Sequence, residues 1–214
     1  MLHAIYRATN DWKVDMIVMC FGFDEPIPLI RKAMDRAHKT EKPPLFFAAT
    51  RNDGAHKHMV WPAKDPSVIG ISSTTANGAA SSFNPLGRGA HPVLYAFGEG
   101  VPVNVIDPRN PDRHITKYVS GTSYATPVAA ALAANLLGCI RMVMETCSQE
   151  DRAIYRHIPE DLQRMSGMLA VLRRRMGRKH SCGVKSLLPW DFLKAELLEK
   201  NKILEDVDQM LRKG

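Results

Sequence analysis

Short apolar runs alternate with polar and amphipathic segments through the first half of the chain. Each run has the length and the Val, Ile, Leu and Phe content typical of a strand buried on both faces of a sheet. Between the first two runs, residues 24–40 place apolar side chains at a helical spacing. Strands and helices in alternation predict an α/β fold with a parallel sheet and flanking helices. The predicted strands are residues 14–20, 43–50, 66–74 and 92–98.

Polar or small residues follow three of these runs. Gly22, Asn52 and the polar segment after Ser73 each come directly after a predicted strand. Ligands of parallel α/β sheets bind beyond the carboxyl ends of the strands. The sequence therefore predicts its candidate chemistry at one edge of the sheet.

The second half of the chain changes character. Residues 101–121 predict a hairpin around a Pro/Asn/Asp turn. An alanine-rich apolar segment, 128–147, predicts a long helix with Pro127 in its first turn. Residues 148–214 are charged and predict a helical C-terminal extension, so we divide the chain into 1–147 and 148–214. A last helix over 191–212 has an apolar stripe that either docks on the body or binds a partner helix; it comprises Leu193, Leu197, Leu204, Val207 and Leu211.

Composition narrows the function classes. With 45% hydrophobic and 24% charged residues, the chain has the composition of a folded soluble protein. No apolar run is long enough, and free enough of alanine, to predict a membrane span. The four cysteines form no CxxC pair and do not cluster with histidines, which argues against a disulfide framework or a metal site. We expect an intracellular, cytoplasmic protein without a cofactor.

The net charge of +7 raises the question of an anionic partner. The densest basic run lacks the interleaved aromatic side chains of a base-stacking surface, which argues against nucleic acid. It is either a solvated helix face or loop, or a surface for another anion. The run comprises Arg173, Arg174, Arg175, Arg178 and Lys179.

Ser123 stands in "SGTSYATP", just before the long apolar segment. Gly121 permits a close approach of the backbone, and a helix start presents free N–H groups and the positive end of its dipole. Such a serine either caps the helix or acts as a nucleophile whose oxyanion its own N–H would meet. The residues alone leave both interpretations open.

Several blocks together resemble one family. "VDMIVMCFG", "FFAATRNDG", "WPAKDPSVIGISSTTANGAASSFNPLG", "LYAFGEGV" and "GTSYATP" resemble, in order, conserved segments of subtilisin-like serine peptidases, the subtilases. The resemblance covers residues 4–137. It implies part of a subtilisin-like fold and a serine endopeptidase that hydrolyses peptide bonds in a polypeptide substrate.

The resemblance also implies individual roles. Ser123 would be the nucleophile, and Asn52 would donate its side-chain amide to the oxyanion, unless it serves only as the turn residue before Asp53 and Gly54. Arg51 replaces a small residue, which would narrow the substrate pocket or favour acidic side chains. The substrate would lie between one rim, Cys20, Phe21 and Gly22, and another, Ala49, Thr50 and Arg51.

The general base and its orienting acid are not recognisable. The family carries them in D-[ST]-G and H-G-T segments, and neither occurs in this sequence. His56 and His58 lie near Asn52 but on a segment that does not carry the base in this family. We therefore expect a C-terminal, truncated part of a catalytic domain that is inert alone. Either an N-terminal segment or complementing chain completes it, or the chain is an inactive pseudo-peptidase or interaction module.

Overall fold

A computed structural model describes residues 1–85, 93–179, 185–188 and 200–213. Its main sheet has the strand order β1-β2-β3-β4-β8-β7, in which the first five strands are parallel and β7 is antiparallel to β8. This arrangement confirms the predicted parallel sheet with flanking helices. The strands are β1 (Met16–Met19), β2 (Leu45–Ala49), β3 (Ile69–Thr74), β4 (Val93–Phe97), β7 (Gly177–Lys179) and β8 (Lys185–Leu187).

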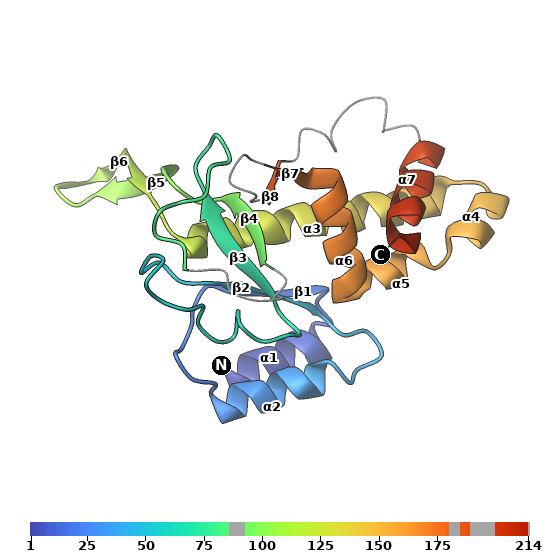
Figure 1. Cartoon of the computed structure of the whole chain (residues 1–214), viewed down its shortest axis with the longest axis horizontal. Coiled ribbons are helices and arrows are strands. Elements are labelled where there is room, and N and C mark those ends of the chain that lie inside the picture. The colour runs from blue at the N-terminus through green and yellow to red at the C-terminus, as the bar shows by residue number, and fades with distance from the viewer. Residues whose placement is uncertain (86–92, 180–184, 189–199, 214) are drawn as a thin grey trace.

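Helices cover both faces of this sheet (Figure 1). The long helix α3 (Thr122–Thr146) contacts β1 to β4 on one face. On the other face lie α1 (Leu2–Tyr6), the π-helical segment η1 (Arg7–Asp11) and α2 (Pro28–Ala37). In β2, Phe47 belongs to the core on the α3 side, whereas Phe46 belongs to the core on the α2 side. Burial on both faces explains why the strand sequences are continuously apolar.

The predicted start of the long helix is wrong. The helix begins at Thr122, so Pro127 lies inside it and not in its first turn. Pro127 has no N–H, so the carbonyl of Ser123, four residues earlier, has no donor within the helix. Cys20 Sγ donates to this carbonyl at 3.3 Å, which helps the helix to continue through the proline.

Helix α3 is also long and apolar enough, by length and composition, to cross a membrane. Core helices pass the same test, and 44% of its most apolar window is buried inside the molecule. Its alanines Ala125, Ala129 and Ala133 have no exposed surface. These small side chains allow the helix to approach the sheet closely beneath the Ser123 region.

The C-terminal part of the chain packs against α3. Its buried side chains, among them Ile158, Leu162 and Leu204, join the same apolar core as Phe47. Leu193 and Leu197 of the predicted last helix lie outside the described residues, but Leu204 and Val207 are buried, so the described part docks on the body. The elements are α4 (Gln149–Tyr155), α5 (Ile158–Gln163), α6 (Met165–Val171), η2 (Leu172–Met176) and α7 (Lys200–Arg212).

This part was predicted to be helical, yet it also supplies β7 and β8. Each of these strands has only three residues, too few for a periodic pattern in the sequence to reveal. At the opposite edge, β1 pairs only with β2 among the described strands, and its Val18 is 41% exposed. The predicted hairpin is confirmed: β5 (Val101–Asp107) and β6 (Asn110–Val119) form an antiparallel pair that projects from the body (Figure 1).

Candidate active site

Three segments meet at the carboxyl end of the sheet. Cys20 follows β1, Asn52 lies just beyond β2, and Ser123 is the second residue of α3. They line one cleft of about 450 Å³. Phe21, Gly22, Ala49 and Arg51 line the same cleft, so seven of the eight residues predicted from the sequence come together here.

The hydroxyl of Ser123 does not cap the helix. Gly121 occupies the N-cap position, and as a glycine it has no side chain to cap the helix. Ser123 Oγ instead donates to the carbonyl oxygen of Cys20 at 3.2 Å. The capping interpretation is therefore wrong, and the hydroxyl lies across the gap between α3 and the end of β1.

Cys20 and Ser123 contact each other twice, because the thiol donates back to the carbonyl of Ser123. Burial raises the pKa of the Cys20 thiol. The thiol therefore keeps its proton at neutral pH and can remain a donor. This pair of contacts connects the first rim of the cleft to the start of α3.

Asn52 is oriented by the start of α3. Its Oδ1 accepts a hydrogen bond from the backbone N–H of Thr122 at 2.7 Å. A backbone N–H can only donate, so the oxygen must face Thr122 and the amide Nδ2 must point elsewhere. Among the described residues Nδ2 has no acceptor, and Asn52 lines the cleft. Gly54 adopts the positive φ of a turn, +80°, so Asn52 does precede a turn. The turn interpretation alone does not explain its hydrogen bond to Thr122.

Thr50 is the predicted residue that does not line the cleft. Its side chain is fully buried, and its Oγ1 lies 2.9 Å from Ser72 Oγ and donates to the carbonyl of Ile71 at 3.2 Å. Successive side chains of an extended chain point to opposite sides. Ala49 and Arg51 face the cleft, so Thr50 faces away from it.

Arg51 faces the cleft with its charge largely offset. Its Nε donates to Asp53 at 2.6 Å, and its Nη1 pairs with Asp24. The guanidinium holds the pKa of the Asp24 carboxyl below its usual range, so this carboxyl stays ionised in neutral solution. The two carboxylates hold Arg51 against one wall, where its side chain is only 18% exposed.

Comparison with known proteins identifies the family of the chain. A family model described as the subtilase family, Peptidase_S8, matches residues 1–147. The chain belongs to the subtilase family. The convergence of Ser123, Asn52 and Cys20 thus occurs in a protein of the peptidase class that their motifs resemble.

Two curated relatives show the extent of the likeness. The chain is 32% identical over 168 residues to the subtilisin-like protease het-Q2 of Podospora anserina, covering 75% of this chain and 44% of the relative. It is 29% identical over 133 residues to the minor extracellular protease Epr of Bacillus subtilis (strain 168), covering 59% of this chain and 19% of the relative. The chain therefore spans less than half of the length of either relative.

Solved structures share the fold. The prenylagaramide maturation protease PagA superposes with a TM-score of 0.63 at 22% identity, covering 89% of this chain and 64% of the other. The self-cleaved protease domain of PatA gives a TM-score of 0.63 at 20% identity, with 96% and 67% covered. These likenesses support the fold of this subtilase.

Sequence reasoning missed five residues of the cleft in this subtilase: Phe23, Asp24, Asp53, Val60 and Thr122. Phe23 pairs with Trp61 through two backbone hydrogen bonds of 2.7 and 2.8 Å, which brings Val60 against Gly22. A side chain at position 22 would collide with Val60, so this wall requires a glycine. Thr122 Oγ1 is buried and has no hydrogen-bond partner among the described residues. Gly22 was the only signal in the sequence for this close approach.

No histidine lines the cleft in the part of the chain that the structure describes. His56 and His58 are exposed in the loop after Asn52. Across the described residues there is also no cluster of three or more His, Cys, Asp and Glu side chains suited to a metal ion.

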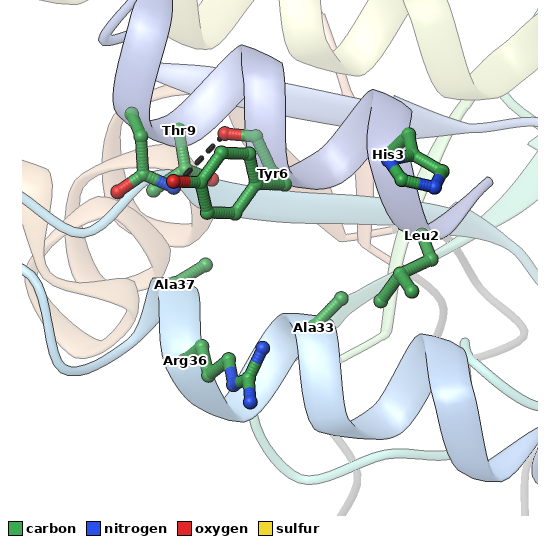
Figure 2. A pocket seen from close by; sticks show the side chains of 8 residues that line it. Leu2, His3, Tyr6, Thr9, Ala33, Arg36 and Ala37 are labelled. Carbon is green, nitrogen blue, oxygen red and sulfur yellow. Dashed lines mark hydrogen bonds between the residues drawn. The ribbon is translucent and has the colours of Figure 1, made fainter.

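A second cavity, of about 230 Å³, lies between α1, η1 and α2 (Figure 2). Leu2 and Tyr6 of the N-terminal segment and Ala33 and Ala37 of α2 line it, with Arg36 beside them. Its walls are mainly apolar, and its lining shares no residue with the Ser123 cleft. We therefore assign it no part in the chemistry of the cleft.

Proposed function

We propose that this subtilase is a serine-type endopeptidase whose Ser123 attacks the carbonyl carbon of a scissile peptide bond. One observation carries the proposal. Ser123 Oγ and an Asn52 amide with no partner among the described residues line a single cleft at the start of α3. An extended polypeptide substrate would lie between the two rims and pair with the backbone at Cys20, Phe21 and Gly22.

Two donors would stabilise the oxyanion. Asn52 Nδ2 is one, because its Oδ1 is already held by Thr122. The backbone N–H of Ser123 is the other, because a residue at the second helical position has no acceptor within the helix. Donors that are fixed before the reaction need no reorganisation during it, and removing one such asparagine in this family costs about 10²–10³ in turnover.

The nucleophile still needs a base. Ser123 Oγ donates to the main-chain carbonyl of Cys20, a group that cannot take up a proton at neutral pH. We propose that a further polypeptide segment or a complementing chain brings a histidine and its orienting acid to the cleft. It would add beside β1, whose outer edge meets no strand within the described residues. In subtilisin, a member of this family, loss of the base alone costs about 10⁶ in turnover.

One observation favours a second function for the chain alone. The Ser123 hydroxyl is bonded to Cys20, and the described lining of the cleft contains no histidine. In this state the cleft would bind an extended peptide without cleaving it, as expected of a pseudo-peptidase or an interaction module.

Chemical rescue tests the endopeptidase proposal. Hydrolysis of a mixed set of fluorogenic peptides is measured with the purified chain, with and without added imidazole as an external base. We expect hydrolysis only with imidazole, and none above background for Ser123→Ala. Asn52→Asp, which keeps the acceptor for Thr122 but removes the donor, should lose most of the rescued rate. Equal rates for the wild type and Ser123→Ala at all imidazole concentrations would contradict the proposal.

A further inference from the structure

We propose that an arginine-lined hollow in the C-terminal part of the chain binds a phosphate group. The hollow has a volume of about 530 Å³ and receives Arg164, Ser166, Arg173 and Arg174. These residues come from the turn before α6, from α6 itself and from η2, and Leu211 of α7 closes one side. We call it the arginine hollow.

The charge within the arginine hollow is unbalanced. Three guanidinium groups line it together with one carboxylate, that of Asp161. Arg164 reaches this carboxylate only at 3.4 Å, with 69% of the arginine side chain exposed, so the pair offsets little charge. Arg173 has no hydrogen-bond or ion-pair partner among the described residues. Like charges gathered in one concavity raise the local potential, and a bound anion lowers it.

Arg174 links the arginine hollow to α7. Its Nη1 donates to the carbonyl of Met210 at 2.7 Å, and its Nη2 donates to the carbonyl of Lys213 at 2.5 Å. These bonds satisfy carbonyls at the C-terminal end of α7, where the helix dipole favours a cation. Arg174 therefore helps to hold the wall that α7 forms, and leaves Arg164 and Arg173 as the groups available to a ligand.

The chemistry of the lining favours a phosphate group. Arginine presents paired N–H donors that match two phosphate oxygens, and Ser166 adds a hydroxyl at the same site. The volume is within the range of small-molecule sites, so the phosphate would be attached to a small group. Arg173 and Arg174 belong to the basic run found in the sequence, and both line this hollow.

The arginine hollow is independent of the Ser123 chemistry. All its residues lie beyond residue 147, where the match to the subtilase family model ends. A failure of peptide hydrolysis would leave this proposal unaffected, and the absence of phosphate binding would leave the Ser123 proposal unaffected.

Calorimetric titration of the chain with pyrophosphate, at constant ionic strength, tests the proposal. We expect saturable binding at one site, weakened about tenfold or more by Arg173→Gln and by Arg164→Gln. Arg113→Gln removes the same charge from an exposed position on β6 and should change the affinity less than about twofold. Circular dichroism of each variant confirms that it is folded.

Two further titrations distinguish the source of the phosphate. ADP and a phosphoserine peptide are compared with adenosine and the unphosphorylated peptide, and the partner that binds more tightly than pyrophosphate identifies the class. Absence of wild-type binding at millimolar pyrophosphate would overturn the proposal. So would an equal loss of affinity in Arg173→Gln and Arg113→Gln, because that result indicates only general attraction to a basic protein.

Discussion

Helix α3 carries Ser123 at its N-terminal end and Arg141 near its C-terminal end, and the polar groups around these two residues differ in how fully they are paired. Arg141 makes two hydrogen bonds of 2.7 Å to Asp15, and Lys42 joins this carboxylate at 2.6 Å. Gln163 donates to the backbone carbonyl of Asp15 at 2.8 Å. This cluster ties the start of β1 to α3 and to α5.

At the Ser123 end, several polar groups are less fully paired. Ser123 Oγ has one partner at 3.2 Å, Asn52 Nδ2 has none among the described residues, and Thr122 Oγ1 is buried without one. Buried polar groups in folded proteins are usually satisfied, so the Thr122 hydroxyl is an exception, whereas Asn52 is exposed at the cleft. The comparison teaches that one end of the helix stabilises the fold, whereas the other leaves donors free for a ligand.

The largest expected effect concerns the close packing beneath Ser123. A methyl group at Gly98 would lie 2.7 Å from Ala125 Cβ and 2.9 Å from the carbonyl oxygen of Gly121. Gly98→Ala should therefore lower the free energy of unfolding by about 1–3 kcal/mol. Urea denaturation measures this change. A loss below about 0.5 kcal/mol would mean that the N-terminal end of α3 relaxes easily and does not depend on this contact.

The stability of the Arg141 end of α3 should decrease in acid. The Arg141 guanidinium, together with Lys42, lowers the pKa of the Asp15 carboxyl from 3.8 to about 2. The folded pKa lies below the unfolded one, so this stabilisation is fully present above the unfolded value and is lost as the pH falls toward 2. Discounted for solvent screening, it amounts to about 1 kcal/mol.

Asp15→Asn is the variant that measures this contribution. At neutral pH it should unfold more easily than the wild type by about 1 kcal/mol, and the difference should shrink as the pH is lowered. A difference that is independent of pH would show that the carboxyl charge of Asp15 does not stabilise this end of the helix.

Substitutions of Asn52 separate its support of the start of α3 from its proposed role as an oxyanion donor. Asn52→Ala removes the acceptor for the N–H of Thr122 and should cost about 1 kcal/mol of stability. Asn52→Asp keeps an oxygen for that N–H and should retain most of the stability. Thermal unfolding of both variants tests this, and equal losses would show that the hydrogen bond to Thr122 does not support the start of α3.

Gly138 provides the smallest expected change, with the opposite sign. It lies inside α3, and a methyl group there would meet no atom within 4 Å. Gly138→Ala should stabilise the protein by about 0.5–1 kcal/mol, because alanine loses less backbone entropy in a helix. It is the matched control for Gly98→Ala, since the same substitution is made where space is open. Destabilisation by both substitutions would contradict the difference between tight packing at Gly98 and open space at Gly138.

Much of the fold could be predicted because both faces of the sheet are buried. Phe46 and Phe47 point to opposite cores, so the strand sequence is apolar throughout and easily recognised. The meeting of Cys20, Asn52 and Ser123 follows from one rule, that the carboxyl ends of parallel strands share one edge.

The features that sequence reasoning missed depend on contacts between distant segments. The helix continues through Pro127, which leaves the Ser123 carbonyl without a donor from the helix. Cys20, 103 residues away from Ser123, donates to this carbonyl instead. The wall at Val60 depends on the pairing of Phe23 with Trp61, which no local pattern reveals. Thr50 is different: it was wrongly placed on the rim with Ala49 and Arg51, although the alternation of side chains in an extended strand makes it face away from both.

The most direct test of the central claim is fluorophosphonate labelling of the chain, with the modified residue located by mass spectrometry. The claim is that Ser123 occupies the position of the nucleophile but has no base among its described neighbours. We predict negligible labelling of the chain alone, and labelling at Ser123 when imidazole is added. Rapid, stoichiometric labelling of Ser123 without imidazole, or labelling of another residue in its place, would contradict the claim.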